Sequence, residues 1–215
     1  MTQISDDETP SILLLSRGWN HDGWANEFYP DDLPQDWRLS YYANEFQAVL
    51  VSESDWLNGD DYEEWLEDVH EEFRFYIELT TDPGDKSGRL QQIVDRLGSR
   101  FAGLIVDVGG NQLVSLSTED LQQLSAIVPA GSDMNMPNNG AWADNEETQV
   151  ADEMVKAFVF KAKGRYSLAD MRKIADMLHQ RAKSGDPALM IFAGEDPDIR
   201  MMQDCRIMLN LMGIA

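Results

Sequence analysis

Ser11-Ile-Leu-Leu-Leu-Ser-Arg-Gly-Trp19 is the stretch of sequence that decides the fold of this chain. Its apolar run has the length of a buried β-strand, and it ends in polar and turn-forming residues. Equivalent runs recur along the chain at Ala48–Ser54, Phe73–Thr80, Gly103–Val108, Phe158–Lys163 and Ala188–Ala193. Together with Ser11–Ser16, these runs predict the strands of a sheet that is buried on both faces.

Segments with a helical spacing of apolar residues separate these runs. Two of them, Asp60–Glu72 and Gly88–Phe101, carry apolar residues on one stripe and charges on the opposite side. Helix starts are also predicted where a serine precedes an aspartate by three residues, at Ser117 and Ser167, and a last helix is predicted from Pro197 to Gly213. Strands that alternate with helices indicate an α/β fold with parallel strands and crossover helices.

The length and composition are typical of one globular domain. The chain has 215 residues, of which 43% are hydrophobic and 26% are charged. We expect an acidic N-terminal tail over residues 1–10, a first part over 11–129, an acidic mobile loop over 130–155, and a last βαβα part over 156–215. The loop is expected because its first eighteen residues combine glycine, proline, asparagine and acids without an apolar period. It either connects two elements or is a lid or partner-binding segment with Trp142 as an anchor.

We expect neither a transmembrane segment nor a secretory signal in this chain. Its apolar runs are too short for a transmembrane helix, and its N-terminus lacks the basic and long apolar regions of a signal peptide. The single cysteine, Cys205, cannot form an intrachain disulfide, which fits a reducing compartment. We therefore expect a cytoplasmic protein that does not contact a membrane.

The charge of the chain is extreme and unevenly distributed. The chain holds 39 Asp and Glu against 17 Lys and Arg, which gives a formal net charge of −22. Residues up to Val155 hold 32 acids and 7 bases, and Ser52–Glu72 alone holds ten acids and no Lys or Arg. Because a phosphate backbone is bound mainly by Lys and Arg, we expect no direct binding of nucleic acid. The acidity serves solubility, including adaptation to high salt, or a docking surface for a basic partner, or mimicry of a nucleic acid's charge.

The aromatic residues near the N-terminus carry a family resemblance. In order, the sequence shows Ser16-Arg-Gly-Trp19, Trp24, Phe28-Tyr-Pro30, Tyr41-Tyr-Ala43 and Phe46. This order and spacing resemble the YecE-like family, domain of unknown function seventy-two, whose members begin with a strand ending in Ser-Gly-Trp. The resemblance covers residues 11–110 and, more weakly, 156–212. It implies a TIM-type (β/α) barrel, in which the C-terminal ends of the strands carry the site.

The chain departs from the family's pattern at positions expected in the barrel mouth. At six positions the residue differs from the polar residue that is typical of the family. These positions are Leu50, Ser52, Glu78, Asp107, Lys161 and Lys163. The segment Asn111–Val155 is also too short for complete fifth and sixth strands. We therefore expect a shortened or incomplete barrel with about six or seven parallel strands, in which the family's activity has been lost.

The alternation of side chains along the strands predicts a cluster of charges inside the barrel. If Phe75, Ile77 and Leu79 face the helices, Glu78 faces the barrel axis. The same alternation brings Asp107, Lys161 and Lys163 to inner faces. An acid beside a base in a partly dry cavity can transfer a proton, and a buried lysine can act as a nucleophile. Alternatively, these charges only neutralise one another, since buried charges need partners.

The loop after the first strand supplies Arg17, Trp19, His21 and Trp24. Aromatic rings beside a cation can clamp a planar or sugar ligand by stacking, or the rings can simply pack against the first helix. The candidate ligand-binding set is therefore Arg17, Trp19, His21, Trp24, Glu78, Asp107, Lys161 and Lys163. No metal site is expected, because the three histidines and the cysteine lack ligand spacing. No cofactor is expected either, because Gly109-Gly110 lacks the later glycine of a dinucleotide fingerprint and a Walker lysine.

These observations predict a non-catalytic binding or protein-interaction domain. Its acidic face is expected to meet a basic protein partner, and the strand C-terminal ends are expected to hold a small molecule. The alternative is a hydrolase-type enzyme that uses carboxylate acid/base chemistry in the barrel mouth, with no catalytic residue assigned. Open sheet edges beside the shortened segment also predict a homodimer, because unpaired edges invite pairing.

Overall fold

The computed structural model describes residues 12–59, 62–79, 86–106, 112–114, 155–162, 166–181 and 187–215. The expected N-terminal tail, the helix expected at Ser117 and residues 130–154 of the expected loop lie outside these ranges. A strand forms in each of the six predicted regions, although some residues at the ends of these regions lie outside the described ranges.

The strands form two sheets, in the orders β1-β7-β6-β5 and β2-β3-β4. The strands are β1 (Ile12–Ser16), β2 (Ala48–Val51), β3 (Arg74–Leu79), β4 (Phe101–Val106), β5 (Gln112–Val114), β6 (Val155–Ala162) and β7 (Ala188–Phe192). Within the described ranges, six strands pair in parallel, and β5 runs antiparallel to β6. The α/β class with parallel strands is thus confirmed, while β5 is an antiparallel strand that the sequence did not predict.

Side chains along the strands alternate between two apolar clusters. The inner cluster draws on both sheets and contains Leu15, Ala48, Leu50, Tyr76, Ile105, Leu189 and Ile191. Residues that follow these in the strands, namely Val49, Val51, Ile77, Met190 and Phe192, belong to a larger outer cluster beneath the helices. Phe75, Ile77 and Leu79 therefore face the helices, as the alternation predicted.

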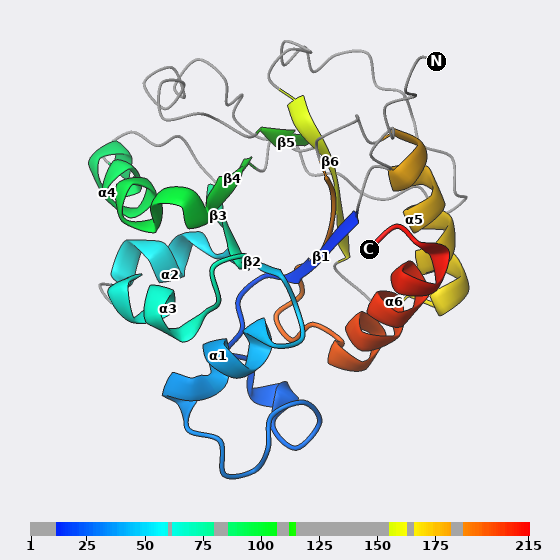
Figure 1. Ribbon diagram of the computed structural model, residues 1–215, viewed down its shortest axis with the longest axis horizontal. Helices are drawn as coiled ribbons and strands as arrows, with labels where there is room; N and C mark the ends of the chain where they lie inside the picture. The colour runs from blue at the N-terminus through cyan, green and yellow to red at the C-terminus, as the bar shows by residue number, and fades with distance from the viewer. Residues whose placement is uncertain are drawn as a thin grey trace, which may run out of the picture.

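The two sheets meet where β1 and β2 end. Arg17 forms an isolated parallel bridge with Leu50, and the N–H of Gly18 donates to the carbonyl of Leu50 over 2.8 Å. Gly18 has a φ of +77°, a conformation that favours glycine, so the chain can turn away directly after the bridge. At the far side of both sheets, β4 lies next to β5 (Figure 1).

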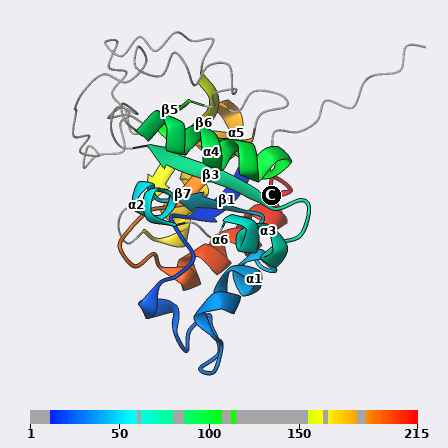
Figure 2. The ribbon, with the colours of Figure 1, turned by 90° about the vertical axis from the view of Figure 1, so that its left-hand side faces the viewer.

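The helices lie outside the strands (Figure 1). They are α1 (Arg38–Ala43), α2 (Glu53–Asn58), α3 (Tyr62–Asp68), α4 (Ser87–Leu97), α5 (Leu168–Arg181) and α6 (Ile199–Met212). In Figure 1, α2, α3 and α4 lie on one side of the strands and α5 and α6 on the other, and Figure 2 shows α4 alongside β3. Every helix in the described ranges is too short or too polar to span a lipid bilayer.

Capping residues set the ends of the last two helices. At the start of α5, the Oγ of Ser167 accepts a hydrogen bond from the N–H of Asp170 over 3.2 Å, which confirms the predicted start. In α6 the carboxylate of Asp198 accepts from the N–H of Met201 over 3.0 Å, so the helix begins at Ile199 instead of the predicted Pro197. Gly213, with a φ of +71°, ends α6 as predicted.

Several predicted boundaries were wrong for identifiable reasons. The strand predicted over Ala48–Ser54 ends at Val51, because Ser52 caps α2. The helix predicted over Gly88–Phe101 ends at Leu97, since Gly98 takes a φ of +53° and Phe101 already belongs to β4. The helix predicted to reach Glu72 ends at Asp68.

Candidate functional site

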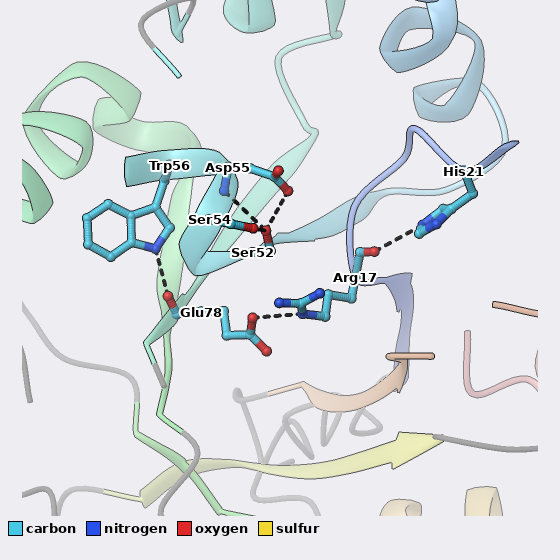
Figure 3. Close-up of polar contacts among 7 residues, drawn as sticks. All are labelled: Arg17, His21, Ser52, Ser54, Asp55, Trp56 and Glu78. Atoms are coloured by element: carbon cyan, nitrogen blue, oxygen red, sulfur yellow. Dashed lines mark hydrogen bonds and ion pairs between the residues drawn. The ribbon is translucent and has the colours of Figure 1, made fainter. Parts of the chain in front are cut away.

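The candidate site begins at the C-terminal end of β1, where successive residues point to opposite sides. The N–H of Ser16 donates to the hydroxyl of Tyr42, which in turn donates to the carbonyl of Ala48, both over 3.0 Å. This contact fixes the end of β1 against α1 and β2. Arg17 follows on the opposite side, and its Nε donates to Oε2 of Glu78 over 2.7 Å. Figure 3 shows the two side chains pointing toward each other, Arg17 from directly after β1 and Glu78 from β3.

Glu78 is held in place by its strand and by a neighbouring helix. It pairs in register with Ile105 of β4, and its carbonyl accepts a hydrogen bond from Nε1 of Trp56 over 2.7 Å. Its side chain is only 6% exposed, whereas that of Arg17 is 35% exposed. A buried carboxylate needs a partner, and Arg17 supplies one. A hydrogen bond to a charged group contributes about 1.5–3 kcal/mol to stability.

The contact with Glu78 orients the guanidinium of Arg17 but engages only one of its three nitrogens. Its Nε is held by Glu78, while its two terminal nitrogens donate no hydrogen bond to any residue in the described ranges. A guanidinium presents its N–H groups as a rigid fork that matches the oxygens of a carboxylate or a phosphate. The pair therefore places an aligned set of donors, partly open to solvent, at the strand ends.

Ser52 lies beside this pair at the end of β2, and it caps a helix. It is 3% exposed, and its Oγ accepts from the N–H of Asp55 over 3.2 Å and donates to Oδ2 of the same residue over 2.6 Å. It also contacts the Oγ of Ser54 over 2.8 Å (Figure 3). Its hydroxyl is therefore committed to the start of α2. We call Arg17, Ser52 and Glu78 the strand-end site.

His21 lies next to the strand-end site, with both ring nitrogens near backbone carbonyls. Its Nε2 is 3.0 Å from the carbonyl of Arg17, and its Nδ1 is 3.3 Å from that of Glu195. Burial lowers the pKa of His21, although hydrogen bonds to these carbonyls and the charge of Asp196 oppose the shift. The imidazole therefore favours the neutral form and links the loop after β1 to the loop after β7.

The two tryptophans of the first loop differ in their surroundings. Trp24 is buried, its ring stacks on Tyr42 with centroids 6.1 Å apart, and its Nε1 donates to the carbonyl of Pro197 over 2.7 Å. Trp19 is half-buried and meets Trp65 of α3 edge-on, with centroids 5.1 Å apart. These contacts are those of packed rings, and they attach the first loop to α1, α3 and the segment before α6.

The structure brings together only some of the candidate residues. Arg17 and Glu78 are in contact, and His21 touches the backbone of Arg17. Asp107 and Lys163 lie outside the described residues. Lys161 belongs to β6 and pairs in register with Ile191, a member of the inner cluster. Among the described residues, no group of three or more His, Cys, Asp or Glu could hold a metal ion.

A second group of charges lies on α3 and the turn before α1. Glu63, Glu64 and Glu67 are exposed, and Asp68 follows them. The pKa of Asp68 is raised by burial and then by the nearby charges of Glu67 and Asp36. Arg96 of α4 reaches Glu63 at 3.9 Å. We call Asp36 and these four α3 acids the acidic face.

Sequence reasoning missed Arg38 as a buried cation. It is 9% exposed, its Nη1 donates to Oδ1 of Asn20, and its guanidinium lies 5.2 Å from the ring centroid of Tyr29. The hydroxyl of Tyr29 donates to the carbonyl of Trp19. Arg38 thus braces the loop that follows Arg17. A lone arginine at a helix start carries no sequence signal for this role. The capping role of Ser52 had a signal, since an aspartate follows it by three residues.

The comparisons with known proteins agree with one prediction. The model of a family described as protein of unknown function DUF72 matches residues 16–110. This match confirms the resemblance predicted for the first part of the chain, whereas residues 156–212 lie outside it. No curated protein and no solved structure matches the chain.

Proposed function

We propose that this chain, a partial and divergent member of the DUF72 family over residues 16–110, is a non-catalytic binding domain built on a shortened TIM-type (β/α) barrel. Its small-ligand site is the strand-end site, and its acidic face binds a basic protein partner. The single, buried Cys205 suits a cytoplasmic location.

The proposed barrel rests on the way the two sheets share their inner face. One apolar cluster takes residues from β1, β2, β3, β4 and β7, and the Arg17–Leu50 bridge joins the sheets. The proximity of β4 and β5 supports closure on the other side. In such a barrel the C-terminal strand ends carry the functional site, and Arg17 and Glu78 lie there.

The observation that carries the proposal is the Arg17–Glu78 pair. The 2.7 Å hydrogen bond from Nε fixes the direction of the guanidinium, and its terminal nitrogens stay available at a partly exposed position. Fixing a donor group in advance lowers the entropic cost of binding. The ligand class that matches this fork is a small anion with planar or tetrahedral oxygens, such as a carboxylate or a phosphate.

The same contacts favour binding over hydrolysis. Glu78 is engaged by Arg17, the hydroxyl of Ser52 caps α2, and the imidazole of His21 lies between two backbone carbonyls. The carboxylate of Asp55 is within hydrogen-bond reach of the Ser52 hydroxyl, as a base beside a nucleophile would be, but the N–H of Asp55 also donates to this hydroxyl, so the two residues form the cap of α2. Among the described residues, these groups are arranged to hold structure and to orient Arg17.

Calorimetric titration with inorganic phosphate, acetate and citrate tests the ligand site. The wild-type protein should bind at least one of these anions, and Arg17→Gln should weaken that binding about ten- to a hundredfold. Arg200→Gln is the matched control, because Arg200 also pairs with a glutamate but lies on α6. Absence of binding to all three anions, or equal losses in both variants, would contradict the proposal.

The acidic face supports the second part of the proposal. Burial raises the pKa of Asp68, and the nearby charges of Glu67 and Asp36 raise it further. These charges are a local excess of negative charge that a cationic partner would relieve. Such binding should weaken steeply with added salt.

Binding of oligolysine, measured at low and high salt, tests the acidic face. Replacing Glu63, Glu64 and Glu67 together by glutamine should weaken binding much more than replacing the exposed Asp22, Asp176 and Asp196 by asparagine. The two variants remove the same charge. Equal effects would show that only net charge matters and would overturn a defined docking surface. Association that does not respond to salt would count against it as well.

A further inference from the structure

The outer side of α5 and α6 carries an apolar groove that the proposed function does not use. The two helices lie side by side, away from the acidic face (Figure 1). Leu168 of α5 and Ile207 and Leu211 of α6 are 42%, 55% and 84% exposed. With Met208 they line an open hollow of about 320 Å³, which we call the α5–α6 groove.

The helix α6 has apolar residues on two sides, as in a helix that packs against a partner on each side. Its inward residues, such as Met202 and Cys205, are buried in the outer cluster. Ile207 and Leu211, spaced by four residues, form a second apolar stripe on the exposed side. Single exposed apolar residues are common on protein surfaces, but a contiguous apolar groove with a polar rim marks an interaction site.

The rim of the groove carries two opposite charges that are not used inside the protein. Arg172 of α5 and Asp204 of α6 line the groove and are exposed. Within the described ranges neither takes part in an ion pair. A surface with an apolar centre and one positive and one negative charge at its rim is self-complementary, because a twofold rotation brings each charge opposite its counterpart.

The distribution of charge selects a second copy of the chain as the occupant. The protein has a net charge of −22, so most of its surface repels another copy. The residues that line the α5–α6 groove include one base, Arg172, and one acid, Asp204, so their charges cancel and two copies can approach here without strong repulsion. We propose that the α5–α6 groove is the interface of a twofold homodimer, in which Arg172 of each copy faces Asp204 of the other. This surface is distinct from the sheet edges at which the sequence predicted pairing.

Sedimentation velocity over a range of concentrations tests this dimer. The wild-type protein should self-associate, and added salt should strengthen the association by screening the net charge. Leu211→Glu should raise the dissociation constant at least about tenfold, because it places a charge in the apolar centre. Trp37→Glu is the control, since Trp37 is 65% exposed on another part of the chain and should leave association unchanged.

A charge exchange gives the sharper result. Arg172→Asp and Asp204→Arg should each abolish self-association, because like charges then meet across the twofold axis. Mixing the two variants should restore a dimer, since the introduced carboxylate of one variant then faces the introduced guanidinium of the other. A wild-type protein that remains monomeric at every concentration would overturn the proposal. So would a dimer that Leu211→Glu does not weaken, or a mixture that does not associate.

Discussion

Arg17 and Glu78 support each other at the level of single residues. Removing the charge of Glu78 leaves a guanidinium without its counterion, although an amide oxygen can still accept its hydrogen bond. Glu78→Gln should therefore lower the free energy of unfolding by about 1–3 kcal/mol. Glu27→Gln, which removes the exposed partner of Arg200, should cost less than about 1 kcal/mol. Chemical denaturation measures both changes, and equal costs would show that the buried pair contributes no more than a surface pair.

His21 makes the stability of the protein depend on pH. Its pKa in the folded protein is lowered by burial from the usual 6.5, so below that pH the unfolded chain binds a proton that the folded protein does not bind. Stability from this group therefore falls as the pH decreases from about 6.5 to the folded pKa, and it is constant above and below this window. His21→Gln should flatten the dependence of stability on pH within the window. A dependence that is unchanged in the variant would show that other groups cause it.

At the level of the element, two serines of identical local pattern allow a matched comparison. Ser52 and Ser167 each accept a hydrogen bond from the N–H of an aspartate three residues later, over 3.2 Å in both cases. Ser52 is buried and Ser167 is exposed. Ser52→Ala should cost about 1–2 kcal/mol of stability and Ser167→Ala about 0.5–1 kcal/mol. The opposite order in thermal or chemical denaturation would show that Ser52 does not hold the start of α2.

Cys205 reports whether α6 stays packed. Burial, followed by the charges of Asp204 and Asp198, raises the pKa of its thiol to about 12. The thiolate is the reactive form, so the folded protein should react slowly with a disulfide reagent such as DTNB, and denaturant should make the reaction fast. Fast labelling of the native protein would show that α6 opens readily.

The sequence predicted elements better than their ends. Apolar runs such as Ala188–Ala193 located the strands, since a buried strand needs little more than continuous apolar residues. The end at Val51 was missed although the aspartate three residues after Ser52 is a signal for a helix cap. The end at Leu97 was missed because it depends on the positive φ of Gly98, which the sequence does not specify. Alternation along β3 correctly placed Phe75, Ile77 and Leu79 on the side of the helices.

For the site, the sequence identified residues but not their partners. It singled out Arg17 and Glu78, which are 61 positions apart, yet the contact between them depends on how β1 and β3 come together around β2. The expected link of Glu78 to Asp107 and Lys161 stays a prediction. The role of Arg38 had no sequence signal, because its partners Asn20 and Tyr29 come from a loop of irregular structure.

At the level of the whole molecule, charge distinguishes the three surfaces for which we propose different functions. The acidic face, the strand-end site and the α5–α6 groove lie on different elements, so variants in one should leave the others unchanged. An anion that binds to a protein of net charge −22 must be attracted by a local arrangement of donors. In the strand-end site, the ends of the strands position the residues that we propose to bind the ligand.

The most direct test of that site is the arginine side-chain region of a ¹H–¹⁵N NMR spectrum, recorded during titration with inorganic phosphate. The Nε–H signal of Arg17, assigned from its loss in Arg17→Gln, should be protected from solvent exchange by the contact with Glu78. It should move with added phosphate, while the signal of Arg200 stays in place. A signal of Arg17 that exchanges as fast as that of Arg200, or that does not respond to phosphate, would contradict the account.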